Sequence, residues 1–525
     1  VPSQFQPDWL TKNGIPGESN PETIASAWVD QFGLEPNEKE NFLNGTVYDW
    51  QDFLFHTGVR KDYDFSISGK ANKVNYFYSL GYSERESVQV QESFKTITSR
   101  LNLDVQATNF LNLGVKANFS YQEEGQVPIS NGGYRTASPY DQPWENNVPR
   151  TRENLKVAGA GSNRGNPFLD PAYKYREYDR YILRPIVYAK LTLPLGITFT
   201  SNYSTRMDFR KRFEYEDSAN PLWSNDGYAR RRHNQGFTWQ SDNIINWDEQ
   251  FGDHRFSFTG LINAESIQNW ETDARTQNFS PTEALGFHAL NFGLAPQIGS
   301  DDQKTTRNAL MARINYSFSD RFNISASIRR DGYSRFGSKN LYATFPSLSG
   351  AWTITNEAFM ESGPKWLSYL KLRASWGVNG NSSGLNSYAA YASLSDDIYL
   401  NYDGGYFVAP YLEINRIANP ELSWEKNNAF NFALDFKLFE SRVSGTLDVY
   451  TSETTELLLD KKLPTLTGFS SITTNVGNLR NKGIDLGITT VNVTKSNFIW
   501  TSTFNIHYNS NKIVSLTGEK IIQTD

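Results

Sequence analysis

Apolar side chains recur at every second position in many separate stretches of the chain from Lys61 onward, with polar residues between them. This two-residue period matches a β-strand, whose successive side chains point to opposite faces. In the clearest stretch, residues 111–121, the intervening positions hold Asn, Gly, Lys, Asn and Ser. The pattern predicts strands with one apolar and one polar face. The apolar positions of this stretch are Leu111, Leu113, Val115, Ala117, Phe119 and Tyr121.

The alternation returns often enough to predict about sixteen strands of roughly 10 to 17 residues, against about five or six residues in an ordinary globular strand. A tilted strand needs about 9 to 11 residues to cross a bilayer, so these lengths suit strands that cross it and project beyond it. We therefore predict an all-β fold, a large antiparallel transmembrane β-barrel with long extracellular loops and short periplasmic turns.

The predicted connections alternate between very short and long. Successive barrel strands run in opposite directions, so this alternation collects the short turns at one end and the long loops at the other. Two connections depart from it, because residues 336–340 are short where a long loop is expected and residues 356–365 are longer than a turn. Short connections are expected near Ala71, Thr108, Pro194, Gly252, Ser319, Glu440 and Lys495, and long ones near Ser87 and over residues 124–179, 211–232, 271–303, 381–420 and 461–474.

Composition agrees with a barrel. Aromatic residues make up 14% of the chain, whereas hydrophobic residues reach only 38% and the mean hydropathy is −0.57. A barrel needs only every second residue apolar and concentrates aromatic rings at the membrane interfaces. No stretch approaches the roughly 18 apolar residues of a membrane-spanning helix, which excludes a helical membrane protein.

Cysteine is absent, which excludes disulfides and cysteine-ligated metal sites. The net charge of −6 offers no general attraction for nucleic acid, so a nucleic-acid partner is not expected.

Residues 1–57 lack the alternation, and a short helix is expected only near residues 22–32. We divide the chain into this irregular segment, 1–57, and a barrel portion, 58–525. The chain begins at Val1 without an export signal, and residues 520–525 read as the start of a strand, so we expect both ends to be truncated.

Several blocks of sequence resemble the SusC/RagA family of TonB-dependent outer-membrane transporters and occur in the family's order. The blocks are YDWQDFLFHTG (48–58), SISG (66–69), YFYSLGY (76–82), RRDGYSRFG (329–337), TFPSL (344–348), LKLRASWGVNGN (370–381), NPELSWEK (419–426) with ALDF (433–436), and TGFSSITTNVGNLRNKGIDL (467–486).

This resemblance implies a Gram-negative outer-membrane protein that imports oligosaccharides or peptides and performs no catalysis. It further implies a 22-stranded barrel, of which about sixteen strands lie here, together with a plug domain and a TonB-contacting motif near the N-terminus of the whole protein. The plug is expected to precede residues 1–57. The partners implied are a SusD-like surface lipoprotein acting as a lid, the TonB complex and outer-membrane lipid.

The long loops contain the candidate substrate-binding residues. Aromatic faces can stack on a sugar ring or pack a peptide side chain, and loops on a rigid scaffold commonly carry binding groups. The alternative, favoured for any single ring, is packing of the loops on each other or on a lid protein. The candidates are Tyr134, Tyr140, Trp144, Trp223, Tyr402 and Tyr406.

The charged motif at residues 329–337 is expected at a strand end, where Gly332 and Gly337 permit a tight reversal. Its Arg329, Arg330, Asp331 and Arg335 could contact a plug or an anionic substrate, whereas the favoured alternative is a solvated strand end with intrachain ion pairs.

We expect no cofactor, because the acidic pairs Asp301–Asp302 and Asp396–Asp397 could hold Ca²⁺ but lack the spaced ligands of a calcium loop. The five histidines have no ligand spacing, and no catalytic motif appears.

Two other function classes remain beside the transporter. A soluble or surface-attached β-rich carbohydrate-binding protein or glycan hydrolase would also contain many Tyr, Trp and Asn residues, but it would bury its apolar strand faces between two sheets. A passive porin-like channel would lack energy coupling.

Overall fold

The computed structural model describes most of the chain. The described residues are 6–12, 14–15, 20–30, 34, 36–129, 138–150, 166–220, 227–278, 285–294, 296–400 and 406–516.

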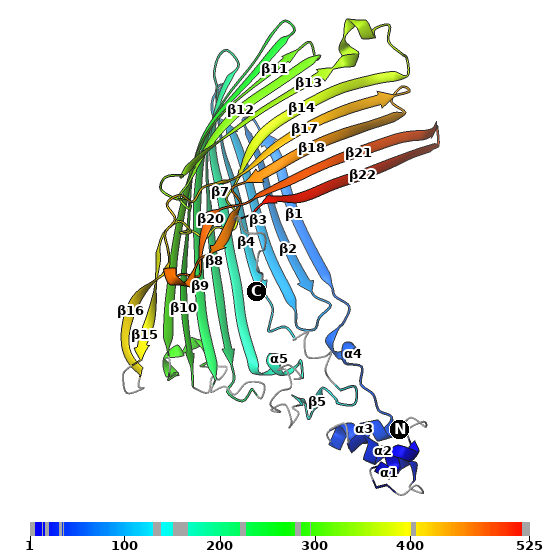
Figure 1. Cartoon of the computed structure of the whole chain (residues 1–525), viewed down its shortest axis with the longest axis vertical. Coiled ribbons are helices and arrows are strands. Elements are labelled where there is room, and N and C mark those ends of the chain that lie inside the picture. The colour runs from blue at the N-terminus through cyan, green and yellow to red at the C-terminus, as the bar shows by residue number, and fades with distance from the viewer. Residues whose placement is uncertain are drawn as a thin grey trace.

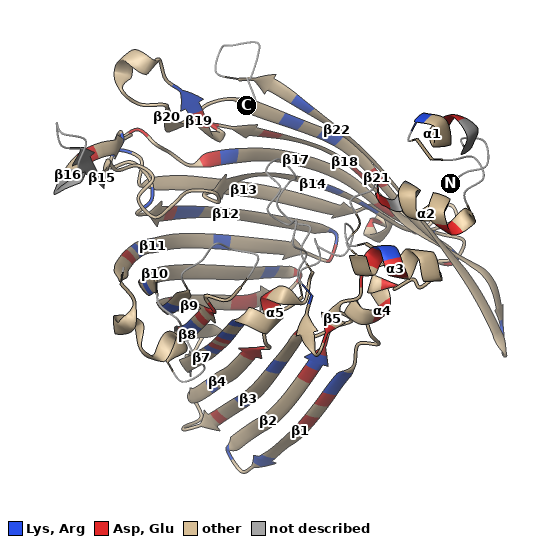
Figure 2. Cartoon of the chain, turned by 90° about the horizontal axis from the view of Figure 1, so that it is seen from below, with Lys and Arg blue, Asp and Glu red and all other residues tan. Residues whose placement is uncertain are grey.

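A single sixteen-stranded antiparallel sheet dominates the structure, as predicted, and each of its strands pairs with the next in chain order (Figure 1). The sheet curves into an open arc with β1 and β22 at its two free edges (Figure 2). Its strands are β1 (Arg60–Ala71), β2 (Val74–Glu86), β3 (Ser93–Gln106), β4 (Leu111–Glu124), β7 (Lys174–Thr192), β8 (Ile197–Glu216), β9 (Tyr228–Phe251), β10 (His254–Gln277), β11 (Gln297–Phe318), β12 (Phe322–Tyr333), β13 (Tyr342–Thr353), β14 (Leu367–Asn381), β17 (Glu425–Leu438), β18 (Val443–Thr455), β21 (Asn478–Lys495) and β22 (Phe498–Ser515).

Strands β7 to β11 are longer than predicted, at 19 to 24 residues. Residues 211–216, 228–232, 271–277 and 297–303, which the sequence pattern assigned to long loops, are in fact paired strand. Charged residues occupy many positions on both faces of these extensions, so the apolar alternation that identifies a strand is weaker there although the backbone pairing continues.

The tight turns and the long connections lie at opposite ends of the sheet, as predicted (Figure 1). The turn between β9 and β10 uses Gly252 at φ +61, a left-handed conformation that favours glycine. Both predicted exceptions occur. β12 and β13 join through residues 334–341 alone, and the connection from β13 to β14 contains the 3₁₀ helices η5 (Ile354–Asn356) and η6 (Ala358–Met360).

The end with the long connections also holds the small elements. Among the described residues, four helices precede β1, whereas residues 1–57 were expected to be irregular apart from the helix near residues 22–32, which is present. The first and third helices begin at or near prolines, and the helix Trp50–Leu54 begins after the N-cap Asp49. None of the described helices is both long and apolar enough to cross a membrane. The small elements are α1 (Gln6–Lys12), α2 (Pro21–Asp30), α3 (Pro36–Asn44), α4 (Trp50–Leu54), α5 (Leu169–Tyr173), η3 (Gly286–His288), η4 (Leu290–Phe292), η7 (Thr465–Thr467) and the strand pairs β5 (Trp144–Glu145) with β6 (Val148–Pro149), β15 (Ser393–Leu400) with β16 (Tyr406–Arg416), and β19 (Leu458–Lys462) with β20 (Ser471–Asn475).

One face of the sheet is apolar and uncovered. Leu113, Val115 and Phe119 are 42%, 36% and 37% exposed, and no second layer of the described chain packs on them. Antiparallel pairing places Leu113 opposite Val105 and Val115 opposite Leu103, so apolar side chains of neighbouring strands share this outer face. An apolar face of this extent is stable only against lipid or another protein.

The opposite, inner face is polar. A hollow of about 750 Å³ near the short-turn end is lined by residues of β9 to β14 and β17, most of them polar. They include Arg255, Asn315, Ser349, Arg373 and Asn431. The sheet therefore separates an apolar outer surface from a hydrated inner one, as a barrel wall does.

We expect Leu348→Arg, which places a charge on the outer face near the middle of β13, to destabilise the folded protein by about 2 to 4 kcal/mol in a bilayer. Ser349→Arg changes the adjacent inner-face residue and is the matched control, with little expected effect. Urea unfolding of the full-length protein in lipid vesicles measures the difference, and equal effects of the two substitutions would contradict the assignment of faces.

Candidate functional site

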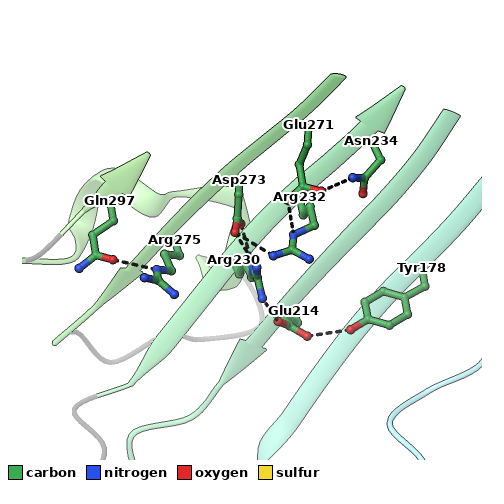
Figure 3. Close-up of polar contacts among 9 residues, drawn as sticks. All are labelled: Tyr178, Glu214, Arg230, Arg232, Asn234, Glu271, Asp273, Arg275 and Gln297. Carbon is green, nitrogen blue, oxygen red and sulfur yellow. Dashed lines mark hydrogen bonds and ion pairs between the residues drawn. The ribbon is translucent and has the colours of Figure 1, made fainter. Parts of the chain in front are cut away.

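Strands β7 to β10 carry closely spaced charged residues toward the end with the long connections (Figure 2), and the two-residue period places many of them on the inner face. Strand register sets Arg232 of β9 opposite Arg212 of β8 on one side and opposite Asp273 of β10 on the other. Figure 3 shows the group these strands assemble, with side chains from β7 to β11 meeting on one surface. The charges belong to the wall of the sheet itself and are held by backbone pairing.

Asp273 is the centre of this group. Arg230 donates two parallel hydrogen bonds to it, from Nε to Oδ1 at 2.8 Å and from Nη2 to Oδ2 at 2.5 Å (Figure 3). Arg232 donates a third hydrogen bond to Asp273 at 3.1 Å. Arg232 also pairs with Glu271, at 3.3 Å between Nε and Oε1. The hydrogen bond to Asp273 raises the pKa of the Arg230 guanidinium, which therefore stays charged.

Tyr178 connects this group to β7. Its hydroxyl donates to Glu214 at 2.8 Å, and Glu214 lies 3.7 Å from Arg230. Burial, reinforced by the Glu214 carboxylate, raises the pKa of Tyr178 to about 12, so the phenol remains a neutral donor. The guanidinium carbons of Arg176 and Arg212 lie 4.9 Å and 5.7 Å from its ring centroid. The tyrosine thus accepts two cation–π contacts.

Asp208 organises a second group on β7 and β8. Arg180 binds it bidentately at 2.9 and 2.6 Å, Arg206 donates to it at 2.7 Å, and Arg210 donates at 3.4 Å. Three arginines therefore share one carboxylate.

A hollow of about 610 Å³ lies beside these groups, where β9 to β14 meet. Asp242, Glu265 and Arg307 line it together with Phe345 and Trp424, so charged groups and two aromatic rings face the same space. Arg307 lies 4.1 Å from the ring centroid of Tyr333 and donates to its hydroxyl at 2.9 Å.

The charged motif at residues 329–337 forms part of this region. Arg329 pairs with Asp331 at 2.8 Å, which is the intrachain ion pair of the favoured alternative. Arg335 donates to the carbonyl of Leu385 at 2.5 Å and so anchors the connection between β14 and β17.

The expected role of the motif's glycines was wrong. Gly332 lies within β12, and neither it nor Gly337 adopts a positive φ. A Cβ on Gly337 would lie 2.1 Å from the carbonyl oxygen of Pro420, so glycine is required there by the close approach of two backbones.

Three of the quoted sequence blocks converge on one aromatic core at this end of the sheet. Tyr333 and Phe336 come from RRDGYSRFG, Phe345 from TFPSL, and Leu422 and Trp424 from NPELSWEK. The rings of Phe336 and Trp424 lie 4.6 Å apart. The core fixes part of the long connection between β14 and β17 against β12 and β13.

Of the predicted aromatic site residues, the structure describes Tyr140 and Trp144 in full. Tyr140 packs edge-on against Phe42 at 5.1 Å, and Trp144 lies 4.2 Å from Phe168 within a core that also contains Trp50. The two rings pack against neighbouring segments at this end of the sheet, and their contact with substrate stays a prediction. Tyr134, Trp223 and Tyr402 lie outside the described residues, as does the side chain of Tyr406.

Of the acidic pairs considered as calcium candidates, the structure describes the side chains of Asp301 and Asp302 alone. Asp301 accepts a hydrogen bond from Gln303 at 2.6 Å, and the side chains of Asp396 and Asp397 lie outside the described residues. Within the described part of the chain, no three His, Asp or Glu side chains are grouped as a metal site would require.

Comparison with known proteins identifies the family. Residues 130–523 match the family model described as TonB dependent receptor-like, beta-barrel. The chain belongs to the TonB-dependent receptor family. TonB-dependent receptor P26 of Formosa agariphila is 30% identical over 517 residues, covering 93% of this chain and 49% of that protein, and TonB-dependent receptor SusC of Bacteroides thetaiotaomicron is 27% identical over 503 residues, covering 90% and 48%.

Solved structures agree on the fold of this TonB-dependent receptor. The RagAB peptide importer in its closed-closed state superposes with a TM-score of 0.79 at 23% identity, covering 98% of this chain and 58% of that chain. The chain thus belongs to the SusC/RagA group, and it spans about half the length of the curated relatives it matches.

The arginine groups on this receptor's inner wall were missed in the sequence. The signal was available, because Arg176, Arg180 and Arg184 follow a period of four, and Arg206 and Arg210 share the parity that places them on one strand face. The sequence pattern assigned residues 124–179 and 211–232 to loops, so Arg176, Arg212 and Arg230 were not placed on a strand face with the others.

We expect Trp424→Ala to loosen the connection between β14 and β17, because it removes a large ring that is only 7% exposed and truncating such a ring costs about 3 to 5 kcal/mol. Limited proteolysis of the full-length receptor in detergent should then cleave faster within residues 382–424. Trp366→Ala, at a ring that is 51% exposed, is the control and should leave cleavage unchanged. Identical digestion of both variants would contradict an anchoring role for Trp424.

Proposed function

We propose that this chain forms the barrel portion of a SusC-like transporter in the Gram-negative outer membrane, which imports oligosaccharides or peptides in a TonB-dependent manner. The two-faced sheet carries this proposal. Its outer face is apolar and uncovered at Leu113, Val115 and Phe119, and its inner face is lined by the charged groups around Asp208 and Asp273.

The inner wall suits transient binding of a hydrophilic cargo. Conduction requires a path that binds cargo strongly enough to admit it and weakly enough to release it. Partly exposed arginines and carboxylates offer hydrogen bonds of this kind, because water competes for them. No covalent step is needed, and we propose no catalytic role for any residue of the chain.

Energy for import would come from the inner membrane through TonB, by way of the plug and TonB-contacting motif proposed for the whole protein. A SusD-like lipoprotein would cover the end of the sheet with the long connections. The helices α3 and α4 and the connection between β4 and β7 support this placement, because they pack together as a structured surface at that end, with Trp50 Nε1 donating to the carbonyl of Ser138 at 2.8 Å.

A soluble β-rich carbohydrate-binding protein or hydrolase is the second candidate function, and the geometry disfavours it. Such a protein would bury its apolar strand faces between two sheets, whereas the described part of this chain places its long strands in one sheet with the apolar face open. A passive channel shares this geometry, so energy coupling distinguishes it from the proposed transporter.

The test is fractionation followed by uptake. We expect the full-length protein to sediment with the outer membrane and to require detergent for extraction. Cells that produce it should accumulate labelled oligosaccharides or peptides only when TonB is functional. Recovery from the soluble fraction would overturn the membrane assignment, and uptake that persists without TonB would indicate a passive channel.

A further inference from the structure

The inner face of β7 and β8 carries six arginines in a ladder that runs along the strands. On β7 they occur every fourth residue, which spaces their backbones by about 13 Å along the strand direction. The β8 members lie opposite or beside them, with Arg210 directly across from Arg180 in the register. The ladder consists of Arg176, Arg180, Arg184, Arg206, Arg210 and Arg212.

The carboxylates on these two strands do not satisfy the ladder. Arg180, Arg206 and Arg210 share Asp208 alone, and each guanidinium has five N–H donors whereas a carboxylate has about four acceptor positions. Their side chains are 30%, 42% and 40% exposed, so unused donors face the inner space. Glu214 interacts with Tyr178 and Arg230 and therefore adds little neutralisation here.

The neighbouring wall is balanced by contrast. On β9 and β10, Arg230 and Arg232 meet Asp273 and Glu271 in close pairs. The inner face of β7 and β8 therefore carries an excess of positive charge, within a chain whose net charge is −6. A local excess of guanidinium groups of this kind is suited to carboxylates and other flat or tetrahedral oxyanions, which arginine binds bidentately.

We infer that the arginine ladder binds the anionic groups of an acidic oligosaccharide, carrying carboxylates or sulfates, as it passes along the inner wall. This inference rests on the proposed transport function and names its substrate class. A repeating acidic glycan presents one sign of charge at regular intervals, which matches a wall of one sign. A mixture of peptides presents both signs together with apolar side chains, which the ladder does not complement.

Binding to the full-length transporter in detergent tests the ladder. The probes are a neutral oligosaccharide, a uronic-acid oligosaccharide and a sulfated oligosaccharide of equal length, together with an acidic peptide. We expect the two acidic glycans to bind at least about ten-fold more tightly than the neutral one, which is the scale of one charge-assisted hydrogen bond. Their affinity should fall as ionic strength rises.

Two variants are expected to change the affinity for acidic glycans in opposite directions. Arg180→Gln combined with Arg210→Gln should weaken binding of the acidic glycans by about ten-fold or more and leave the neutral probe unchanged. Asp208→Asn keeps the shape of the side chain and releases the three arginines, so it should strengthen binding of the same glycans. Lys70→Gln combined with Lys73→Gln is the matched control, because it removes two charges from exposed positions at the short turn between β1 and β2.

Several results would overturn the inference. They are equal affinity for neutral and acidic glycans, tighter binding of the acidic peptide than of either acidic glycan, or the same response to Asp208→Asn as to the double arginine variant. In each of these cases cargo still binds, so the proposed transport function survives. If no oligosaccharide or peptide binds and none is taken up, the proposed function itself fails.

Discussion

Every backbone N–H and C=O group within a lipid bilayer must find its hydrogen-bond partner inside the protein, because the hydrocarbon offers none. The sixteen-stranded sheet meets this constraint by pairing each strand with the next, in long uninterrupted registers such as that of β9 with β10. The register then decides the side of every residue. Since the side-chain period is two, a slip by one position would turn Leu348 toward the inside and Ser349 toward lipid.

The same pairing explains how the strands leave the membrane. On the outer face of β4, β7 and β8, Tyr121 and Tyr181 pack at 4.9 Å, and one step further toward the long connections Lys211 bonds to Glu177 and Asp179. Aromatic rings followed by charges mark the interface at which an outer face passes from lipid to water. Beyond it the sheet continues as paired strand, and the charged wall around Asp273 lies on its inner side.

Much of the fold could be predicted from the sequence, because the alternation of apolar residues is a direct record of a sheet with lipid on one side. The residues 111–121 illustrate this. The extensions of β7 to β11 could not be predicted in this way, since charged residues occur on both of their faces and Lys211 or Arg231 gives no sign of which face it occupies. The helix α3 was not predicted for a related reason, because its sequence is mostly polar.

The candidate site was harder to predict from the sequence than the fold. Sequence blocks marked Trp424, Tyr333 and Phe345, yet only the structure brings these separated residues into one core. The sharing of Asp208 by three arginines depends on cross-strand register, which a single sequence does not specify. Rings such as Trp144 are equally suited to packing and to binding, so their residue type alone does not assign a role.

The most direct test of a lipid-facing outer surface measures which side chains of β4 contact lipid. Spin labels placed one at a time over residues 111–121 of the full-length receptor in vesicles report accessibility to oxygen, which partitions into lipid, and to a water-soluble nickel complex. If the apolar face contacts lipid, accessibility should alternate with a period of two residues. Leu113, Val115 and Phe119 should be accessible to oxygen, and the positions between them should be accessible to the nickel complex. Labels at Leu113, Val115 and Phe119 that are shielded from both reagents would contradict it.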